Sequence, residues 1–137
     1  MKSQYLKPEL IVMLTHYAVR DITTQMQVAG IELSELRVVG GGAKSALWNQ
    51  IKADVTGLSV NVPEITETTA LGAAFLALVG IGAYGSLAEV SEHIVKIREC
   101  IDPDPAAVSM YAEAYRQYRQ TYFALLPVFE EAARRAA

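Results

Sequence analysis

Gly40, Gly41 and Gly42 are the residues whose type and spacing most clearly suit ligand chemistry in this 137-residue chain. They follow the apolar Val38-Val39 pair and precede a segment of helical periodicity that starts at Ser45. Glycine permits backbone conformations that other residues resist, and it leaves space for a ligand beside the main chain. The helix N-terminus that follows offers unpaired N–H groups and a partial positive charge. A buried strand, a glycine turn and a helix in this order predict a site for a phosphate or for the ribose-phosphate part of a nucleotide.

The glycine turn does not match two common phosphate-binding patterns. Only one residue separates Gly42 from Lys44, which excludes G-x-x-x-x-G-K-[ST], and Ser45 stands where G-x-G-x-x-G requires its last glycine. The glycines alone therefore leave a second interpretation open, in which they form a tight strand-to-helix turn that binds no ligand.

Alternating helices and strands are expected to position this turn. Apolar residues recur at steps of three and four in the helical segments, and Gly30 and Gly57 follow two of them as C-caps. Thr68 or Thr69 is expected to cap a third helix, which is apolar all round and therefore expected to be buried. The expected elements are helix 9–29, strand 37–39, helix 45–56, strand 59–62 and helix 70–79.

The C-terminal part is expected to be mainly helical. Residues 86–95 suit a short helix after a glycine-rich turn, although residues 94–97 also suit a short strand. Asp104 is a reasonable N-cap with Pro105 at the first helical position, and a long helix over 105–135 follows. Pro127 should kink or split that helix. The fold class is therefore α/β, helix-rich with a small incomplete sheet, which indicates part of a larger fold.

Composition and charge narrow the class of protein. Hydrophobic residues make up 52% and charged residues 20%, which suits one globular domain over residues 1–137. The net charge of -3 includes no run of one sign, so we expect neither a nucleic acid nor a membrane partner. The strongly apolar stretch 70–83 is shorter than the roughly 20 residues of a spanning helix. Cys100 is the one cysteine, so no internal disulfide forms and a reducing cytoplasm is the expected compartment.

Residues 40–57 carry a resemblance to a known family. They read Gly-Gly-Gly-Ala-Lys-Ser-Ala-Leu-Trp-Asn-Gln-Ile-Lys-Ala-Asp-Val-Thr-Gly, which resembles the adenosine-motif region of the FGGY carbohydrate kinases. Segments 62–64, 70–74 and 103–105 continue the resemblance in the same order, so that it covers the chain from about Glu9 onward. Within the family, the glycine segment is most similar to xylulokinase-type pentulose kinases, and residues 53–58 also resemble kinases of the autoinducer-2 type.

The resemblance implies a partial actin-like ATPase (ribonuclease H-like) fold, of which this chain is the C-terminal domain. ATP or ADP with Mg would lie on this domain, so the expected main contacts of the nucleotide are Gly41, Gly42 and Ala43. Ser45 falls where the family places a polar residue near the adenine, and it also suits a helix cap. Lys44 either reaches a phosphate or is solvated.

The resemblance also suggests roles for residues outside the turn. Trp48 is expected to pack against the helix that precedes the strand. Gly72 and Ala73 either let the third helix approach the nucleotide region closely or serve simple helix–helix packing.

Family members carry a catalytic aspartate well upstream of the glycine turn, where it acts as general base on the sugar hydroxyl. Only 39 residues precede Gly40, and Asp21 among them is expected to be a surface charge. We therefore assign no catalytic residue. The chain is expected to be the ATP-binding portion of a kinase for a pentulose-like sugar and to be inactive alone. A non-catalytic truncated module and an unrelated α/β nucleotide-binding protein remain open as alternatives.

The expected partners are a nucleotide and either the missing N-terminal kinase domain or a second copy of the chain. A chain with 52% hydrophobic residues that lacks its companion domain should expose apolar surface and self-associate, by exchange of a terminal helix for example. His16 and His93 lie in no metal-ligand constellation, so no metal site is expected. A stripe of tyrosines at helical spacing is expected to pack in the core; its members are Tyr111, Tyr115, Tyr118 and Tyr122.

Overall fold

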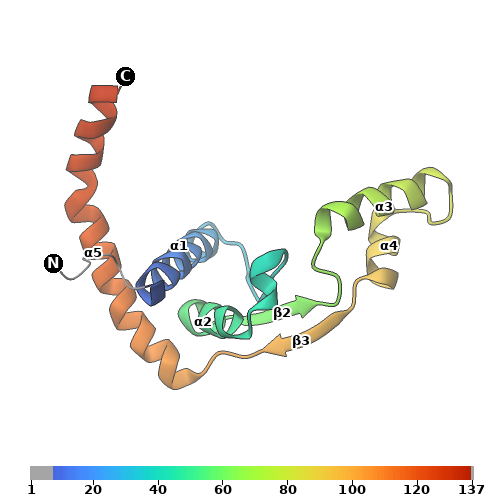
Figure 1. Ribbon diagram of the computed structural model, residues 1–137, viewed down its shortest axis with the longest axis horizontal. Helices are drawn as coiled ribbons and strands as arrows, with labels where there is room; N and C mark the ends of the chain where they lie inside the picture. The colour runs from blue at the N-terminus through green and yellow to red at the C-terminus, as the bar shows by residue number, and fades with distance from the viewer. Residues whose placement is uncertain (1–7, 137) are drawn as a thin grey trace.

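The computed structural model describes the backbone of residues 8–136 and the side chains of residues 15–135. Helices and strands alternate along this part of the chain (Figure 1). Their bounds are α1 Pro8–Val28, β1 Glu35–Arg37, the 3-10 turn η1 Gly41–Lys44, α2 Ala46–Thr56, β2 Ser59–Pro63, α3 Thr68–Gly80, α4 Leu87–Ile94, β3 Ile97–Ile101 and α5 Pro105–Ala136. The predicted α/β class with a small sheet is confirmed.

The sheet has the order β1-β2-β3, with β2 in the centre. β1 runs parallel to β2, with Leu36 opposite Val60, and the crossover between them contains the glycine turn and α2. β3 runs antiparallel to β2, with Glu99 opposite Val62. Two strands were predicted, with a short strand at 94–97 only as an alternative, so β3 at Ile97–Ile101 is a correction. Four of its five residues are exposed, and an edge strand of this kind carries no alternation of apolar residues.

The first strand ends earlier than predicted. The prediction placed it at 37–39, whereas β1 ends at Arg37. Val38 is buried and its N–H still donates to the carbonyl of Asn61 at 3.1 Å, but Val39 is 48% exposed. The chain therefore leaves the sheet at these two valines, and they lead it into the glycine turn.

Two apolar clusters meet at α2. On its sheet side, Ala53 packs with Val60 and Val62. On its other side, Val55 packs with Tyr17 of α1 and Tyr115 of α5. Because α2 contributes to both clusters, the position of its N-terminus relative to the sheet is fixed by packing from two sides.

The predicted tyrosine packing is confirmed for three of the four residues. Tyr115 is buried, and Tyr111 and Tyr118 pack against the same cluster. Tyr122 is instead 43% exposed, and its ring contacts those of Phe123 and Phe129 within α5.

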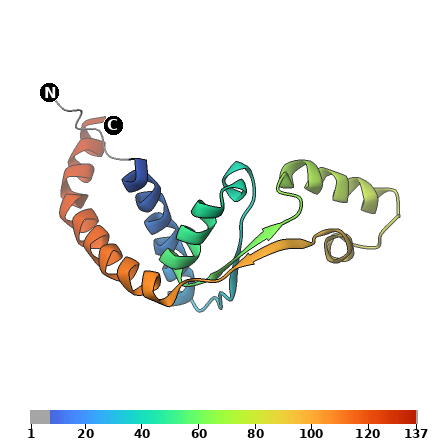
Figure 2. The ribbon, with the colours of Figure 1, turned by 60° about the horizontal axis from the view of Figure 1, so that its bottom comes forward.

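The prediction that α3 is buried is wrong. None of its residues is buried, and Leu76 is 64% exposed. Its main neighbour among the described residues is α4, and Figures 1 and 2 show this pair at the end of the molecule remote from α5. The predicted cap is also wrong, because the helix begins at Thr68 and Glu67 occupies the cap position without a side-chain bond. An apolar helix therefore lies uncovered on most of its surface.

The long C-terminal helix begins as predicted. The Asp104 carboxylate accepts a hydrogen bond from the N–H of Ala106 at 2.9 Å, and Pro105 is the first helical residue. Pro127 lies inside α5, so of the two predicted outcomes, a kink or a split, the split does not occur. Figure 2 shows α5 as one curved helix. Helix-favouring alanine, glutamate and arginine residues after Pro127 continue the helix past the donor that proline lacks.

Candidate functional site

The glycine turn begins with a backbone conformation that requires glycine. Gly40 has φ 73° and ψ -164°, in a region that residues with a Cβ rarely adopt. Its N–H donates to the carbonyl of Thr66 at 2.9 Å, and Thr66 is itself buried just before α3. Gly40 therefore lets the chain change direction after β1, and its hydrogen bond connects the turn to the segment that follows β2.

The turn itself is the 3-10 segment Gly41–Lys44. The N–H of Ala43 donates to the carbonyl of Gly40 at 3.2 Å, and that of Ser45 donates to the carbonyl of Gly42 at 3.3 Å. Gly41 and Gly42 are both exposed. A Cβ at Gly41 would meet no atom within 4 Å, so open space lies beside the exposed main chain there.

Ala43 points the other way. Its side chain is only 1% exposed and packs with Val38 and Val60 in the sheet-side cluster. Ala43 is one of the five residues predicted to contact a ligand, and it can do so only through its backbone. The methyl group anchors the turn to the core.

Ser45 caps α2, as the sequence suggested. Its hydroxyl accepts a hydrogen bond from the N–H of Trp48 at 3.3 Å, which satisfies one of the donors at the start of the helix. The structure thus places the exposed glycines directly before a capped helix N-terminus, where partial positive charge accumulates.

Lys44 is exposed at the end of the turn. Its ammonium nitrogen lies 3.8 Å from a carboxylate oxygen of Glu67, and both side chains are about 70% exposed, at 67% and 73%. An ion pair this long and this exposed contributes little stability. The Lys44 cation is therefore free to reorient toward an anion near the turn.

Trp48 packs under the turn and against α1. Its ring meets that of His16 edge-on, with centroids 5.4 Å apart, which confirms the predicted contact with the helix before the strand. A Cβ placed on Gly42 would lie 3.6 Å from the same ring. The indole, which is 37% exposed, therefore lies beside the turn and contacts α1.

Asn49 is a residue that sequence reasoning missed. It is 1% exposed, and its side-chain Nδ2 donates to the carbonyl of Ala43 at 2.9 Å. In the sequence, the residue lies between Trp48 and Gln50 within the segment that resembles the kinase family, and no role was predicted for it. A polar residue four positions after Ser45 on the inward face of α2 is the one signal that pointed to it.

Gly72 and Ala73 do not contribute to the turn. A Cβ at Gly72 would meet no atom within 4 Å, and Ala73 is exposed. Among the described residues nothing packs closely against Gly72, and a role of these small residues beside a nucleotide stays a prediction.

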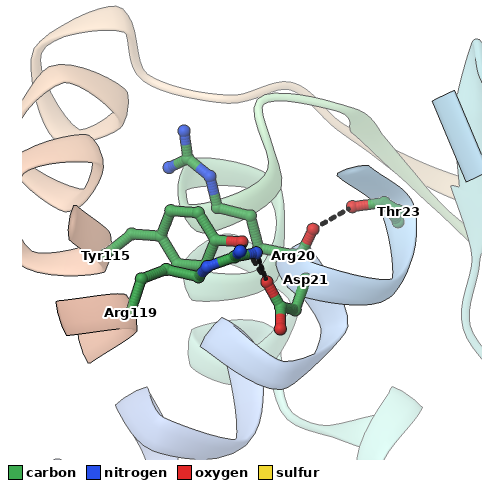
Figure 3. Close-up of polar contacts among 5 residues, drawn as sticks. All are labelled: Arg20, Asp21, Thr23, Tyr115 and Arg119. Atoms are coloured by element: carbon green, nitrogen blue, oxygen red, sulfur yellow. Dashed lines mark hydrogen bonds and ion pairs between the residues drawn. The ribbon is translucent and has the colours of Figure 1, made fainter. Parts of the chain in front are cut away.

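Asp21 is not a simple surface charge, and that prediction is corrected. Its carboxylate accepts hydrogen bonds from the hydroxyl of Tyr115 and from Nη1 of Arg119, each at 2.5 Å (Figure 3). Arg20 stacks its guanidinium 4.7 Å from the centroid of the Tyr115 ring and donates to the carbonyl of Val55 at 2.9 Å. These contacts join α1 to α5 and to α2, at a place apart from the glycine turn.

A cavity of about 560 Å³ lies next to Asp21, between α1 and α5. Its lining is mainly apolar and includes Ile22, Met26 and Tyr118, and none of the glycine-turn residues contributes to it. Within the described part of the chain, no three histidine, cysteine or acidic side chains gather as a metal site would require. No described helix is long and apolar enough to cross a membrane.

Solved sugar kinases share this fold. Xylulose kinase from Rhodospirillum rubrum matches with a TM-score of 0.75 and 26% identity, over 95% of this chain and 27% of that one. Plasmodium falciparum glycerol kinase with ADP matches with a TM-score of 0.67 and 21% identity, over 82% of this chain and 23% of that one. The fold is that of part of the C-terminal domain of an actin-like ATPase.

The sequence comparisons define the family. The model of the FGGY family of carbohydrate kinases, C-terminal domain, matches residues 11–81. Autoinducer-2 kinase from Salmonella paratyphi B is 43% identical over 94 residues, which are 69% of this chain and 18% of that protein. The chain belongs to the FGGY family of carbohydrate kinases and spans about a fifth of the length of this curated relative.

Proposed function

We propose that this chain is the ATP-binding portion of a kinase that transfers the γ-phosphate of ATP to a hydroxyl of a pentulose-like sugar. The observation that carries the proposal is the exposed turn Gly41–Lys44, which joins the end of β1 to the capped N-terminus of α2. Open space beside Gly41 lets an anionic ligand approach the main chain.

The residues of the turn have different proposed roles in nucleotide binding. Gly41 and Gly42 present exposed backbone to the nucleotide, and Ala43 holds the turn against the core. Ser45 lies at the N-terminus of α2, where we place the adenine end of the nucleotide. Lys44 adds a flexible cation that strengthens phosphate binding without being essential, because its side chain is solvated.

Magnesium does not fit a site made by the described residues alone. They hold no cluster of three acidic, histidine or cysteine side chains, so magnesium would be bound through the phosphates of the nucleotide and through residues elsewhere in a kinase. The chain's own contribution is to bind and orient the nucleotide.

Calorimetric titration with Mg-ADP tests nucleotide binding. We expect weak but saturable binding, since one wall of the kinase cleft comes from the rest of the enzyme. Absence of binding at millimolar Mg-ADP would contradict the proposal and favour the alternative of a non-catalytic structural module.

The chain by itself is proposed to be inactive as a kinase. Asp21, the acid singled out before the glycine turn, is held by Tyr115 and Arg119 and is thus not available as a general base. A sugar-dependent ATPase assay on this chain should give no turnover above the background without sugar. Clear sugar-dependent turnover would contradict this part of the proposal.

A second candidate substrate is autoinducer-2. The 43% identity to the Salmonella paratyphi B autoinducer-2 kinase is higher than the 26% identity to the Rhodospirillum rubrum xylulose kinase. Assays of a kinase polypeptide that includes these residues, with xylulose and autoinducer-2 as competing acceptors, distinguish the two by the mass of the phosphorylated product.

The exposed apolar surface is proposed to contact the remaining part of the kinase. Leu76 on α3 and Phe129 on α5 are more than half exposed, at 64% and 51%. Without that partner, two copies of the chain should associate through these surfaces.

The free thiol of Cys100 is consistent with the reducing cytoplasm proposed as the compartment.

A further inference from the structure

One buried side chain of α2 donates a hydrogen bond to the backbone of the glycine turn. Asn49 lies within the first turns of the helix, and its Nδ2 donates to the carbonyl of Ala43 at 2.9 Å. Both residues are 1% exposed. We infer that Asn49 is a positioning residue for nucleotide binding, which it serves by fixing the shape of the turn; this inference rests on the proposed function.

The hydrogen bond acts on one specific peptide group. The carbonyl of Ala43 belongs to the peptide that links Ala43 to Lys44, and that peptide is planar and trans. Holding the carbonyl toward the core therefore fixes the plane of the whole peptide. It also sets the direction in which the chain carries Lys44 toward solvent and Ser45 into α2.

The buried position of Asn49 carries a free-energy cost. Its Oδ1 is buried and has no hydrogen-bond partner among the described residues. A buried amide with one unsatisfied acceptor is unfavourable relative to an apolar side chain of similar shape. What an apolar side chain cannot supply is the donor to the Ala43 carbonyl.

Trp48 provides a direct optical report on the turn. It is the single tryptophan of the chain, and its ring lies 3.6 Å from the position of a Cβ on Gly42. A change in the turn must change the surroundings of this indole. The emission of the wild-type chain therefore reports the conformation set by Asn49, with or without a nucleotide.

The test combines affinity, stability and Trp48 emission for Asn49→Leu and Asn49→Ala. Leu keeps the branch at Cγ, and Ala avoids overpacking should the Leu variant fail to fold. Arg20→Met is the matched control, because it removes a side-chain bond of the same 2.9 Å length to a carbonyl at the other end of α2, that of Val55.

We expect both Asn49 variants to bind Mg-ADP about threefold to tenfold more weakly than the wild type, as the loss of one hydrogen bond implies. Their Trp48 emission should shift, and both variants should have a lower melting temperature, because the buried carbonyl of Ala43 loses its donor. Arg20→Met should lower the melting temperature and leave affinity and emission unchanged. Wild-type affinity in either folded Asn49 variant overturns the inference.

Failure of the proposed function is separable from failure of this inference. If the wild-type chain binds no Mg-ADP, the proposed function fails, and Trp48 emission in the absence of nucleotide still tests the shape of the turn. An unchanged emission spectrum in both Asn49 variants would then overturn the positioning role, and a shifted spectrum would support it.

Discussion

Asp21 of α1 accepts a hydrogen bond from the hydroxyl of Tyr115 of α5, with 2.5 Å between the two oxygen atoms (Figure 3). The two residues are 94 positions apart in the sequence. Arg119 pairs with the same carboxylate oxygen, and Arg20 stacks on the Tyr115 ring. The long C-terminal helix is therefore held to the first helix by a small polar cluster as well as by apolar packing.

Removing the Tyr115 hydroxyl tests this link. Tyr115→Phe should lower the free energy of unfolding by about 1 kcal/mol, the value for a hydrogen bond to a charged group after allowance for partial exposure. Urea denaturation measures the change. Tyr122→Phe removes a hydroxyl from a ring that is 43% exposed, and it should leave the free energy of unfolding unchanged.

Alkaline pH should destabilise the fold. Burial raises the pKa of Tyr17, Tyr111 and Tyr115 above their ordinary value of 10.0, and for Tyr115 the hydrogen bond to Asp21 raises the pKa further. A raised pKa stabilises the folded state fully below pH 10.0, and that stabilisation is lost as pH rises through the raised pKa.

Lys52 has the opposite effect on stability. Burial lowers its pKa below 10.5, so its contribution to the free energy of unfolding increases as the pH rises. Three tyrosines should outweigh this single lysine, so urea midpoints should fall as the pH rises from about 10 to about 11. The urea midpoint of the Tyr115→Phe variant should fall less steeply with pH than that of the wild type. A midpoint that rises over this interval would contradict the prediction.

Gly42→Val should abolish nucleotide binding. The Cβ itself fits, at 3.6 Å from the Trp48 ring, but the added methyl groups must displace either the indole or a ligand above the turn. Lys44→Ala should keep most of the affinity, because the lysine is 67% exposed. Gly80→Val is the control: its Cβ meets nothing within 4 Å, and the residue lies at the end of α3. Calorimetry with Mg-ADP compares all three.

Substitutions of Ser45 separate its two roles. Ser45→Ala removes the cap of α2 and should cost about 1 kcal/mol of stability. Ser45→Asp retains a capping oxygen and should keep the stability, but its larger, charged side chain should interfere with the adenine end of the nucleotide and weaken binding. Equal nucleotide affinity in the wild type and the Asp variant would place the adenine end of the nucleotide away from this helix terminus.

The chain should self-associate at high concentration. Leu76→Glu places a charge on the exposed face of α3, and it should reduce the average mass measured by light scattering without changing the helical signal in circular dichroism. A strictly monomeric wild-type chain at high concentration would contradict the prediction.

Local signals in the sequence were sufficient for most element boundaries. Gly30 and Gly57 have φ values of 84° and 72°, which explains why each glycine follows the end of its helix. Ser45 and Asp104 cap the helices that they were predicted to cap. These features depend on a residue and its close neighbours in the chain, so a single sequence contains the required information.

Long-range features could not be predicted in the same way. Hydrophobicity predicted burial for α3, but burial requires a covering surface, and among the described residues α4 covers only part of the helix. The links from Asp21 to Tyr115 and from Asn49 to Ala43 depend on how the helices and the turn pack together. The type of residue alone indicated a surface charge at Asp21 and gave no specific role to Asn49.

The attachment of α3 and α4 has a consequence for local unfolding. The two helices join the rest of the chain through β2 and β3, and no residue of α3 is buried. Val90 of α4 is the one buried residue of the pair among the described residues, so opening the pair exposes little new apolar surface and its free energy lies below that of global unfolding. Amide protons of α3 should exchange with deuterium sooner than those of β2, whose Val60 and Val62 are fully buried. The polypeptide thus contains a core of α1, α2, α5 and the sheet, and an attached helical pair that unfolds independently of it.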